Sequence, residues 1–253
     1  KAEFRTLGPS DALKGRTAAL FFEKPSLRTR VTFEVAMIQT GGAAVVLDPS
    51  SVSLGKRESV HDAAKSLSRW VDCIVARTFS QGLVEELAQY ASVPVINALT
   101  DIEHPCQALA FGEMMVEKRG ALRDLKVAFI GDGNNVANSL AALAGHCGMH
   151  FTLACPEGYD PSEEYLNKAK GHVTIHRDAR EAAQNADLVV TDVWASMGQE
   201  EEQARRVAAF KDFQVTQDLM ALADRNALFM HCLPAHRGEE VTSEVIDGPQ
   251  SVV

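Results

Sequence analysis

The chain reads Phe21-Phe22-Glu23-Lys24-Pro25-Ser26-Leu27-Arg28-Thr29-Arg30 at the point where an apolar run gives way to a helical pattern. The run from Thr17 to Phe22 predicts a buried strand, and Val31 to Thr40 has the spacing of a helix that stops at two glycines. This placement makes Ser26 the N-cap residue. A strand that feeds directly into a helix is the repeating unit of a parallel α/β sheet.

The same turn has the chemistry of an anion site. A helix N-terminus offers N–H groups without helical partners and the positive end of the helix dipole. The hydroxyls of Ser26 and Thr29 and the guanidinium groups of Arg28 and Arg30 would add donors for a phosphate. An ordinary capped helix with solvated arginines is the alternative, and the local pattern alone does not decide between them.

Outward from this stretch, apolar runs alternate with helical patterns along the whole chain. Such repetition predicts parallel sheets covered by helices on both faces. A polar, glycine-containing break at Lys118 to Ala121 suggests two domains, residues 1–119 and 120–253. We therefore expect an α/β protein with two doubly wound parallel-sheet domains and an active site in the cleft between them.

Composition excludes several classes of function. The formal net charge of −9 argues against a general attraction to nucleic acid or to an anionic membrane surface. No apolar run approaches the ~20 residues of a membrane span. The five cysteines are irregularly spaced and form no CxxC pair, which argues against a disulfide framework and a structural zinc site. A reducing, cytoplasmic location is expected.

Other distinctive polar residues also stand just after apolar strands or open a helix, where parallel sheets bind their ligands. They are Arg77, His104 with Gln107, Asp192 with Ser196, and Cys232. Each has an ordinary alternative: a surface arginine, a capping histidine, a solvated carboxylate or an inert core thiol. The turn Gly131-Asp132-Gly133-Asn134-Asn135 is an incomplete dinucleotide motif, and its amides at a helix start suit a substrate carboxylate.

Four ordered motifs resemble the signatures of the aspartate/ornithine transcarbamylase family, and the later ones resemble its ornithine branch. They are Ser26-Leu27-Arg28-Thr29-Arg30, His104-Pro105-Cys106-Gln107-Ala108-Leu109, Asp192-Val193-Trp194-Ala195-Ser196-Met197-Gly198-Gln199-Glu200 and His231-Cys232-Leu233-Pro234. The resemblance implies an enzyme of arginine biosynthesis that needs neither metal nor organic cofactor. Its substrates would be carbamoyl phosphate and L-ornithine. The carbamoyl group would pass to the δ-amine of L-ornithine, giving citrulline and phosphate.

The resemblance also implies roles for individual residues. The catalytic set would be Arg28, Arg77, His104 and Cys232. Carbamoyl phosphate would be bound by Ser26, Leu27, Arg28, Thr29, Arg77, His104, Gln107, Cys232 and Leu233. Ornithine would be bound by Asn135, Asp192, Ser196 and Met197. Cys232 would orient the δ-amine rather than attack as a nucleophile, while His231 and His236 are interpreted as structural.

Further features bear on assembly and on rival functions. The polar loop with Ser53, Lys56 and Arg57 is similar to the family loop that reaches a neighbouring subunit, which implies a homotrimer. Phe111 stands where the family usually has aspartate. The family pattern also includes a leading helix and a segment beyond Val253. The alternatives are a transcarbamylase for putrescine or N-acetylornithine, a non-catalytic ligand-binding paralogue and, more remotely, an NAD-dependent oxidoreductase.

Overall fold

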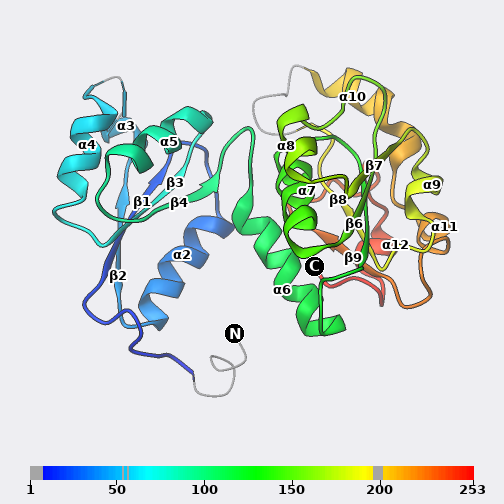
Figure 1. Ribbon diagram of the computed structural model, residues 1–253, viewed down its shortest axis with the longest axis horizontal. Helices are drawn as coiled ribbons and strands as arrows, with labels where there is room; N and C mark the ends of the chain where they lie inside the picture. Colours follow the sequence, from blue (N-terminus) through cyan, green and yellow to red (C-terminus); the bar gives the residue numbers. More distant parts are fainter. Residues whose placement is uncertain (1–7, 53, 56, 196–201) are drawn as a thin grey trace. The chain divides into compact units, whose positions relative to one another are not determined.

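A computed structural model describes residues 8–52, 54–55, 57–195 and 202–253. It forms two compact units, Lys1–Glu103 and His104–Val253, each built on a parallel sheet (Figure 1). The predicted class, α/β with two parallel-sheet domains, is confirmed. The predicted ornithine residues Ser196 and Met197 lie outside the described residues, as do Ser53 and Lys56 of the polar loop.

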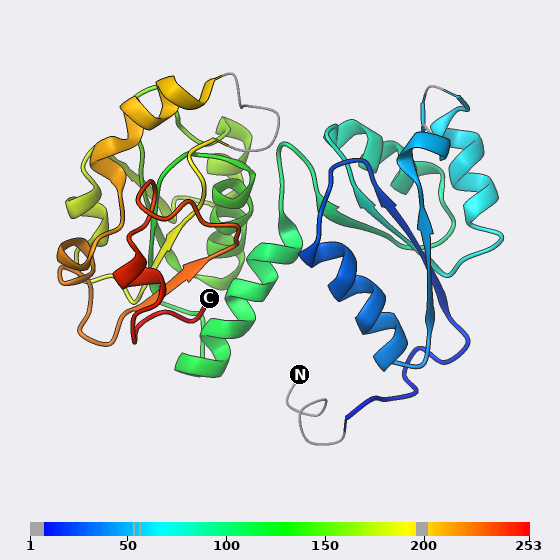
Figure 2. The ribbon, with the colours of Figure 1, turned by 180° about the vertical axis from the view of Figure 1, so that it is seen from behind.

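Unit 1 contains a four-stranded parallel sheet in the order β2-β1-β3-β4. Its strands are β1 (Thr17–Phe22), β2 (Ala43–Leu47), β3 (Cys73–Arg77) and β4 (Val95–Leu99). Its helices are α2 (Arg28–Gln39), α3 (Pro49–Val52), α4 (Val60–Leu67) and α5 (Gln81–Tyr90). Helix α2 covers one face of this sheet, and α4 and α5 cover the other (Figures 1 and 2).

Two buried clusters explain the continuous apolar sequence of β1. Successive strand residues point to opposite faces, so Leu20 packs with Met37 of α2 while Phe21 packs with Leu87 of α5. Both faces of the sheet are therefore covered and buried, as in parallel sheets generally. Helix α2 begins at Arg28, within one residue of the start that an N-cap at Ser26 predicts.

Unit 2 contains a five-stranded parallel sheet in the order β7-β6-β5-β8-β9. The strands are β5 (Lys126–Ile130), β6 (His150–Ala154), β7 (Val173–His176), β8 (Leu188–Thr191) and β9 (Leu228–His231). The helices are α6 (Pro105–Arg119), α7 (Asn135–Cys147), α8 (Glu163–Lys168), α9 (Ala179–Ala183), α10 (Gln203–Phe210), α11 (Gln217–Met220) and α12 (Ser243–Ile246).

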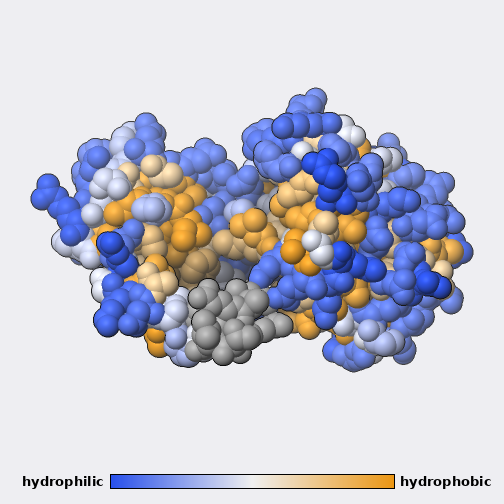
Figure 3. All heavy atoms as spheres, turned by 60° about the horizontal axis from the view of Figure 1, so that its bottom comes forward, coloured by the Kyte–Doolittle hydropathy of each residue, from blue (hydrophilic) through white to orange (hydrophobic). Residues whose placement is uncertain are grey.

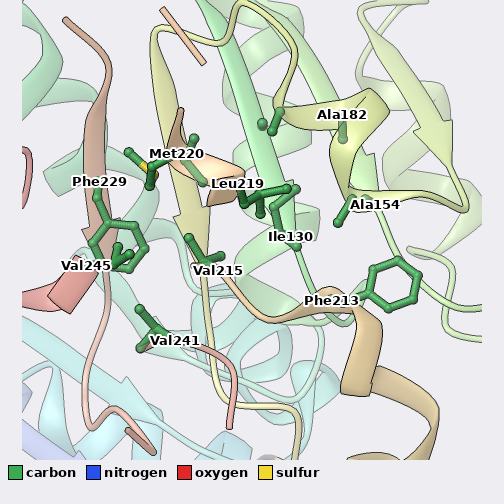
Figure 4. Close-up of a cluster of buried hydrophobic side chains, with 14 of the residues drawn as sticks. Ile130, Ala154, Ala182, Phe213, Val215, Leu219, Met220, Phe229, Val241 and Val245 are labelled. Carbon is green, nitrogen blue, oxygen red and sulfur yellow. The ribbon is translucent and has the colours of Figure 1, made fainter. Parts of the chain in front are cut away.

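The sheet of unit 2 also has a hydrophobic cluster on each face. One face packs Phe129 and Phe151 against α6 and α7. The other packs Ile130 and Phe229 against side chains such as Val245 (Figure 4). Chain order reverses between β5 and its neighbour β8, so their carboxyl ends form the switch point where such sheets bind ligands.

Helix α6 packs against α7 and is grouped with unit 2, although the sequence interpretation places it at the end of the first domain. The division into functional domains at residues 1–119 and 120–253 stays a prediction.

Apolar side chains remain exposed on one face of unit 1 (Figure 3). They include Val31, Val35 and Ile38 of α2 and Val45 of the edge strand β2. Among the residues that the structure describes, no helix combines the length and the apolar character that crossing a membrane requires.

Candidate functional site

The turn between β1 and α2 is shaped by a hydroxyl cap. Ser26 Oγ accepts a hydrogen bond from the Thr29 N–H at 3.2 Å. Leu27 directly precedes the first residue of α2, and its backbone is already helical with φ −75° and ψ −57°. Ser26 therefore caps the first turn with its hydroxyl, as predicted. Leu27 and Arg28 are exposed beside it.

The structure brings Arg77 to the same turn. Strands β1 and β3 are neighbours, with Phe22 opposite Arg77 in the register, and the Glu23 N–H donates to the Arg77 carbonyl at 2.8 Å. Arg77 Nη1 lies 3.4 Å from Thr29 Oγ1, and the residue is only 8% exposed. A guanidinium, two hydroxyls and a helix start thus converge, an arrangement suited to a phosphate.

Two further side chains, unnoticed in the sequence, hold this turn in place. Lys24 is 4% exposed, forms an ion pair with Asp101, and its Nζ lies 4.8 Å from the centroid of the Phe79 ring. The Glu23 carboxylate accepts a hydrogen bond from the Phe79 N–H at 3.0 Å. These contacts tie the β1–α2 turn to the loops that follow β3 and β4.

In unit 2, Asp192 is the centre of a polar cluster at the carboxyl ends of β5, β8 and β9. Asn134 Nδ2 donates to Asp192 Oδ2 at 2.8 Å, while Asn134 Oδ1 caps α7. Asp192 Oδ1 accepts from Cys232 Sγ at 2.9 Å and from the Val193 N–H at 2.8 Å. The predicted residues Asp192 and Cys232 therefore lie together. Asn134 contacts them directly, whereas the predicted Asn135 is the half-buried first residue of α7.

The environment of Cys232 keeps its sulfur protonated. Burial, followed by the neighbouring Asp192 carboxylate, raises the pKa of the Cys232 thiol well above its usual range. Because the thiolate is the nucleophilic form of cysteine, this thiol is a poor nucleophile at neutral pH. It instead donates a hydrogen bond that orients the Asp192 carboxylate.

A buried histidine–glutamate pair holds the turn after β9. His231 Nδ1 accepts a hydrogen bond from the Leu233 N–H at 2.8 Å, so the ring hydrogen is on Nε2, which donates to Glu240 Oε1 at 3.0 Å. The same Glu240 oxygen accepts from the His236 N–H at 2.7 Å. The peptide bond between Leu233 and Pro234 is cis. Sequence reasoning missed Glu240, which follows no periodicity.

Two groups of side chains in the described part of the chain have possible metal-ligand atoms within 4.8 Å of one another. They are Asp192 with His231 and Cys232, and His236 with Glu239 and Glu240. In the first group both ring nitrogens of His231 are engaged, and the thiol is protonated. The possible metal-ligand atoms of this group already form hydrogen bonds with one another or with neighbouring residues. The arrangement therefore suits the recognition of a polar ligand better than the binding of a metal ion.

His104 and Gln107 lie at the start of α6. The His104 N–H donates to Ser139 Oγ of α7 at 2.8 Å, and the histidine is buried. Pro105 occupies the first helical position, where its missing N–H is not needed, and Gln107 is half-buried in the same turn. Phe111 is buried in the apolar cluster of α6 and α7, so its ring contributes to the core.

Two family models match the chain. The model described as "Aspartate/ornithine carbamoyltransferase, carbamoyl-P binding domain" matches residues 1–115, and the corresponding "Asp/Orn binding domain" matches residues 123–253. The chain belongs to the aspartate/ornithine carbamoyltransferase family. In this carbamoyltransferase, the first matched region holds the β1–α2 turn, Arg77, His104 and Gln107. The second holds the Asp192 cluster.

Known relatives agree with this assignment. The ornithine carbamoyltransferases of Chlorobaculum tepidum and Methylococcus capsulatus are 51% and 52% identical to the chain, each over 245 residues. These matches cover 95% and 97% of this chain and 72% and 82% of the relatives. The structure of the ornithine carbamoyltransferase from Pyrococcus furiosus matches with a TM-score of 0.95 and 47% identity, covering 100% of this chain and 83% of that one.

The same fold occurs in an enzyme whose name gives N-acetyl-L-ornithine, rather than ornithine, as the substrate. A structure described as N-acetyl-L-ornithine transcarbamylase matches this carbamoyltransferase with a TM-score of 0.87 but at 32% identity. That match covers 99% of this chain and 87% of the other. The fold is therefore common to both kinds of enzyme, and the site has to distinguish between them.

Proposed function

We propose that the protein is an ornithine carbamoyltransferase, which transfers the carbamoyl group of carbamoyl phosphate to the δ-amine of L-ornithine. The observation that supports this most directly is the Asp192 carboxylate, buried and oriented by Asn134 and Cys232. A fixed carboxylate attracts the ammonium group of an amino acid and disfavours a dicarboxylate such as aspartate. The relatives that are about half identical in sequence to this chain are named ornithine carbamoyltransferase.

The residues of unit 1 are proposed to bind the phosphate. Ser26, Leu27, Arg28 and Thr29 offer the start of α2, and Arg77 adds a buried positive charge. Their donors would hold the phosphate as negative charge builds on it when the carbon–oxygen bond breaks.

Residues of unit 2 are proposed to act on the carbamoyl group and on ornithine. His104 and Gln107 would polarise the carbamoyl carbonyl, and Cys232 and Leu233 would contact the same group. Asp192 would bind the α-amino group, with Asn135, Ser196 and Met197 completing the ornithine site. The δ-ammonium, whose pKa in water is about 10, first loses a proton. Its nitrogen then forms a bond to the carbonyl carbon as phosphate leaves.

The proposal also covers the oligomeric state, the cellular location and the pathway of the enzyme. We propose a homotrimer in the cytoplasm, working in arginine biosynthesis without a cofactor. The exposed apolar face on α2 and β2 supports subunit contact, and the irregular cysteines support a reducing compartment. Sedimentation equilibrium would test the trimer, which predicts three times the mass of one chain. A monomer at micromolar concentration would contradict it.

The decisive experiment measures citrulline formation from carbamoyl phosphate and ornithine, with putrescine, N-acetylornithine and aspartate in parallel. Turnover with ornithine alone is expected. Preference for putrescine or N-acetylornithine would contradict the proposed substrate, and the absence of turnover with every amine would contradict the enzymatic function.

An arginine pair tests the phosphate site. Arg28→Ala is expected to lower kcat/KM for carbamoyl phosphate by about 100-fold or more, because it removes a charged donor from the proposed site. The control is Arg69→Ala. Arg69 is exposed and lies shortly before the amino end of β3, whereas Arg77 is the last residue of that strand. Equal effects of the two substitutions would contradict the assignment.

A further inference from the structure

We propose that Arg206 is a positioning residue for the amine substrate, because it holds together the two turns that present Asn134 and Asp192. This inference rests on the proposed function. It assigns a task to a helix residue that belongs to none of the four motifs.

The contacts of one nitrogen atom support the inference. Arg206 lies on α10 and is only 7% exposed. Its Nη1 donates to Asp132 Oδ2 at 2.8 Å and to the Trp194 carbonyl at 3.0 Å. Asp132 precedes Asn134 by two residues in the turn after β5, and Trp194 follows Asp192 by two residues in the turn after β8. A single guanidinium therefore links both turns.

Two further contacts hold the guanidinium in place. Arg206 Nε lies 3.2 Å from Glu202 Oε2, and its guanidinium carbon is 5.1 Å from the centroid of the Tyr159 ring. The Tyr159 carbonyl in turn accepts a hydrogen bond from the Gly133 N–H at 2.9 Å. A planar guanidinium makes these contacts in fixed directions, whereas a lysine ammonium offers one compact charge.

The link matters because the Asn134–Asp192 hydrogen bond joins the same two turns. The Asn134 N–H donates to the Asp132 carbonyl at 2.7 Å, so a movement of Asp132 reaches Asn134 through one hydrogen bond. Burial already raises the pKa of Asp132 with Arg206 beside it. Without the guanidinium, Asp132 would have to take up a proton or turn toward water. Either change would loosen the Asp192 carboxylate.

The test compares adjacent arginines on α10. In Arg206→Gln, the KM for ornithine is expected to rise about 10- to 100-fold, as misplaced binding groups commonly cause. The KM for carbamoyl phosphate should stay within about twofold, because Arg206 contacts Asp132, Trp194, Glu202 and Tyr159 of unit 2, whereas the turn proposed to bind the phosphate lies in unit 1. Arg206→Lys should restore part of the loss. Arg205→Gln is the control, since Arg205 is 72% exposed and lies 3.6 Å from the same Glu202.

Hydrogen exchange gives a second measurement that does not depend on turnover. Amide exchange should become faster at residues 131–135 and 192–195 in Arg206→Gln, while β6 and β7 keep the wild-type rates. Equal increases in both KM values, or faster exchange across the whole sheet, would show a merely structural role and overturn the inference. If the wild type makes no citrulline, the proposed function fails, and unchanged exchange at these two turns would separately overturn the role of Arg206.

Discussion

At Asp192, one carboxylate links the ends of three neighbouring strands. Its hydrogen-bond partners are Asn134 in the turn after β5, Val193 in the turn after β8, and Cys232 directly after β9. Burial and then the neighbouring Asp192 carboxylate raise the pKa of the Cys232 thiol, and the Cys232 thiol in turn donates the hydrogen bond that orients Asp192. The two predicted site residues therefore depend on one another.

This dependence can be measured at Cys232. In Asp192→Asn, the pKa of the Cys232 thiol should fall toward its usual value, because the substitution removes a negative neighbour, although burial still raises it. Alkylation of Cys232, followed by peptide mass spectrometry between pH 7 and 10, should reach half its maximal rate at a lower pH in the variant. An unchanged midpoint would show that the carboxylate does not act on the thiol.

At the scale of helices, two glycines show when packing overrides helix propensity. Gly145 lies in α7, and a Cβ placed there would be 2.8 Å from both the Ala169 Cα and the Lys168 carbonyl oxygen. Gly82 lies in α5, where the nearest atom would be Ser80 Oγ at 3.6 Å. The first glycine permits α7 and α8 to approach closely, while the second has space for a methyl group.

Opposite effects of the same substitution are therefore expected. Gly145→Ala should lower the free energy of unfolding by about 1–3 kcal/mol through overpacking. Gly82→Ala should raise it by about 0.5–1 kcal/mol, because alanine loses less backbone entropy in a helix. Urea denaturation of both variants checks this. Stabilisation by Gly145→Ala would mean that α8 moves away without cost.

Elements and motif positions were predictable because both leave periodic or local signals. Apolar runs predicted the strands, and parallel strands necessarily bring their carboxyl ends together, which placed Asp192 near Cys232. Lys24, Glu240 and Arg206 were missed because their partners are distant in sequence, and charged residues on polar segments usually remain in water. The start of α2 was predicted to within one residue because the capping hydroxyl of Ser26 is a local signal in the sequence.

For the molecule as a whole, buried thiols predict a loss of stability in alkaline solution. Burial raises the pKa of Cys155 to about 11. The unfolded chain releases this proton near pH 8.5, whereas the folded chain keeps it until about pH 11. Between these values the folded state binds more protons, so the free energy of unfolding falls as pH rises.

A comparison of melting temperatures tests this effect. From pH 8 to pH 10.5, the Tm of the wild type should fall more steeply than that of Cys155→Ser, whose hydroxyl does not titrate in this range. The full contribution amounts to about 3.5 kcal/mol, because the pKa rises from about 8.5 to about 11 and each unit of pKa corresponds to roughly 1.4 kcal/mol. Parallel curves for the two proteins would show that Cys155 does not contribute to the alkaline loss.

The Asp192 carboxylate also limits how a substrate can meet it. A carboxylate has about four lone-pair positions, and in the described structure the donors of Asn134, Val193 and Cys232 occupy three of them. An incoming ammonium group would find about one acceptor position, with its direction set by the other three. The cluster would then select the angle at which an amine arrives as well as its charge.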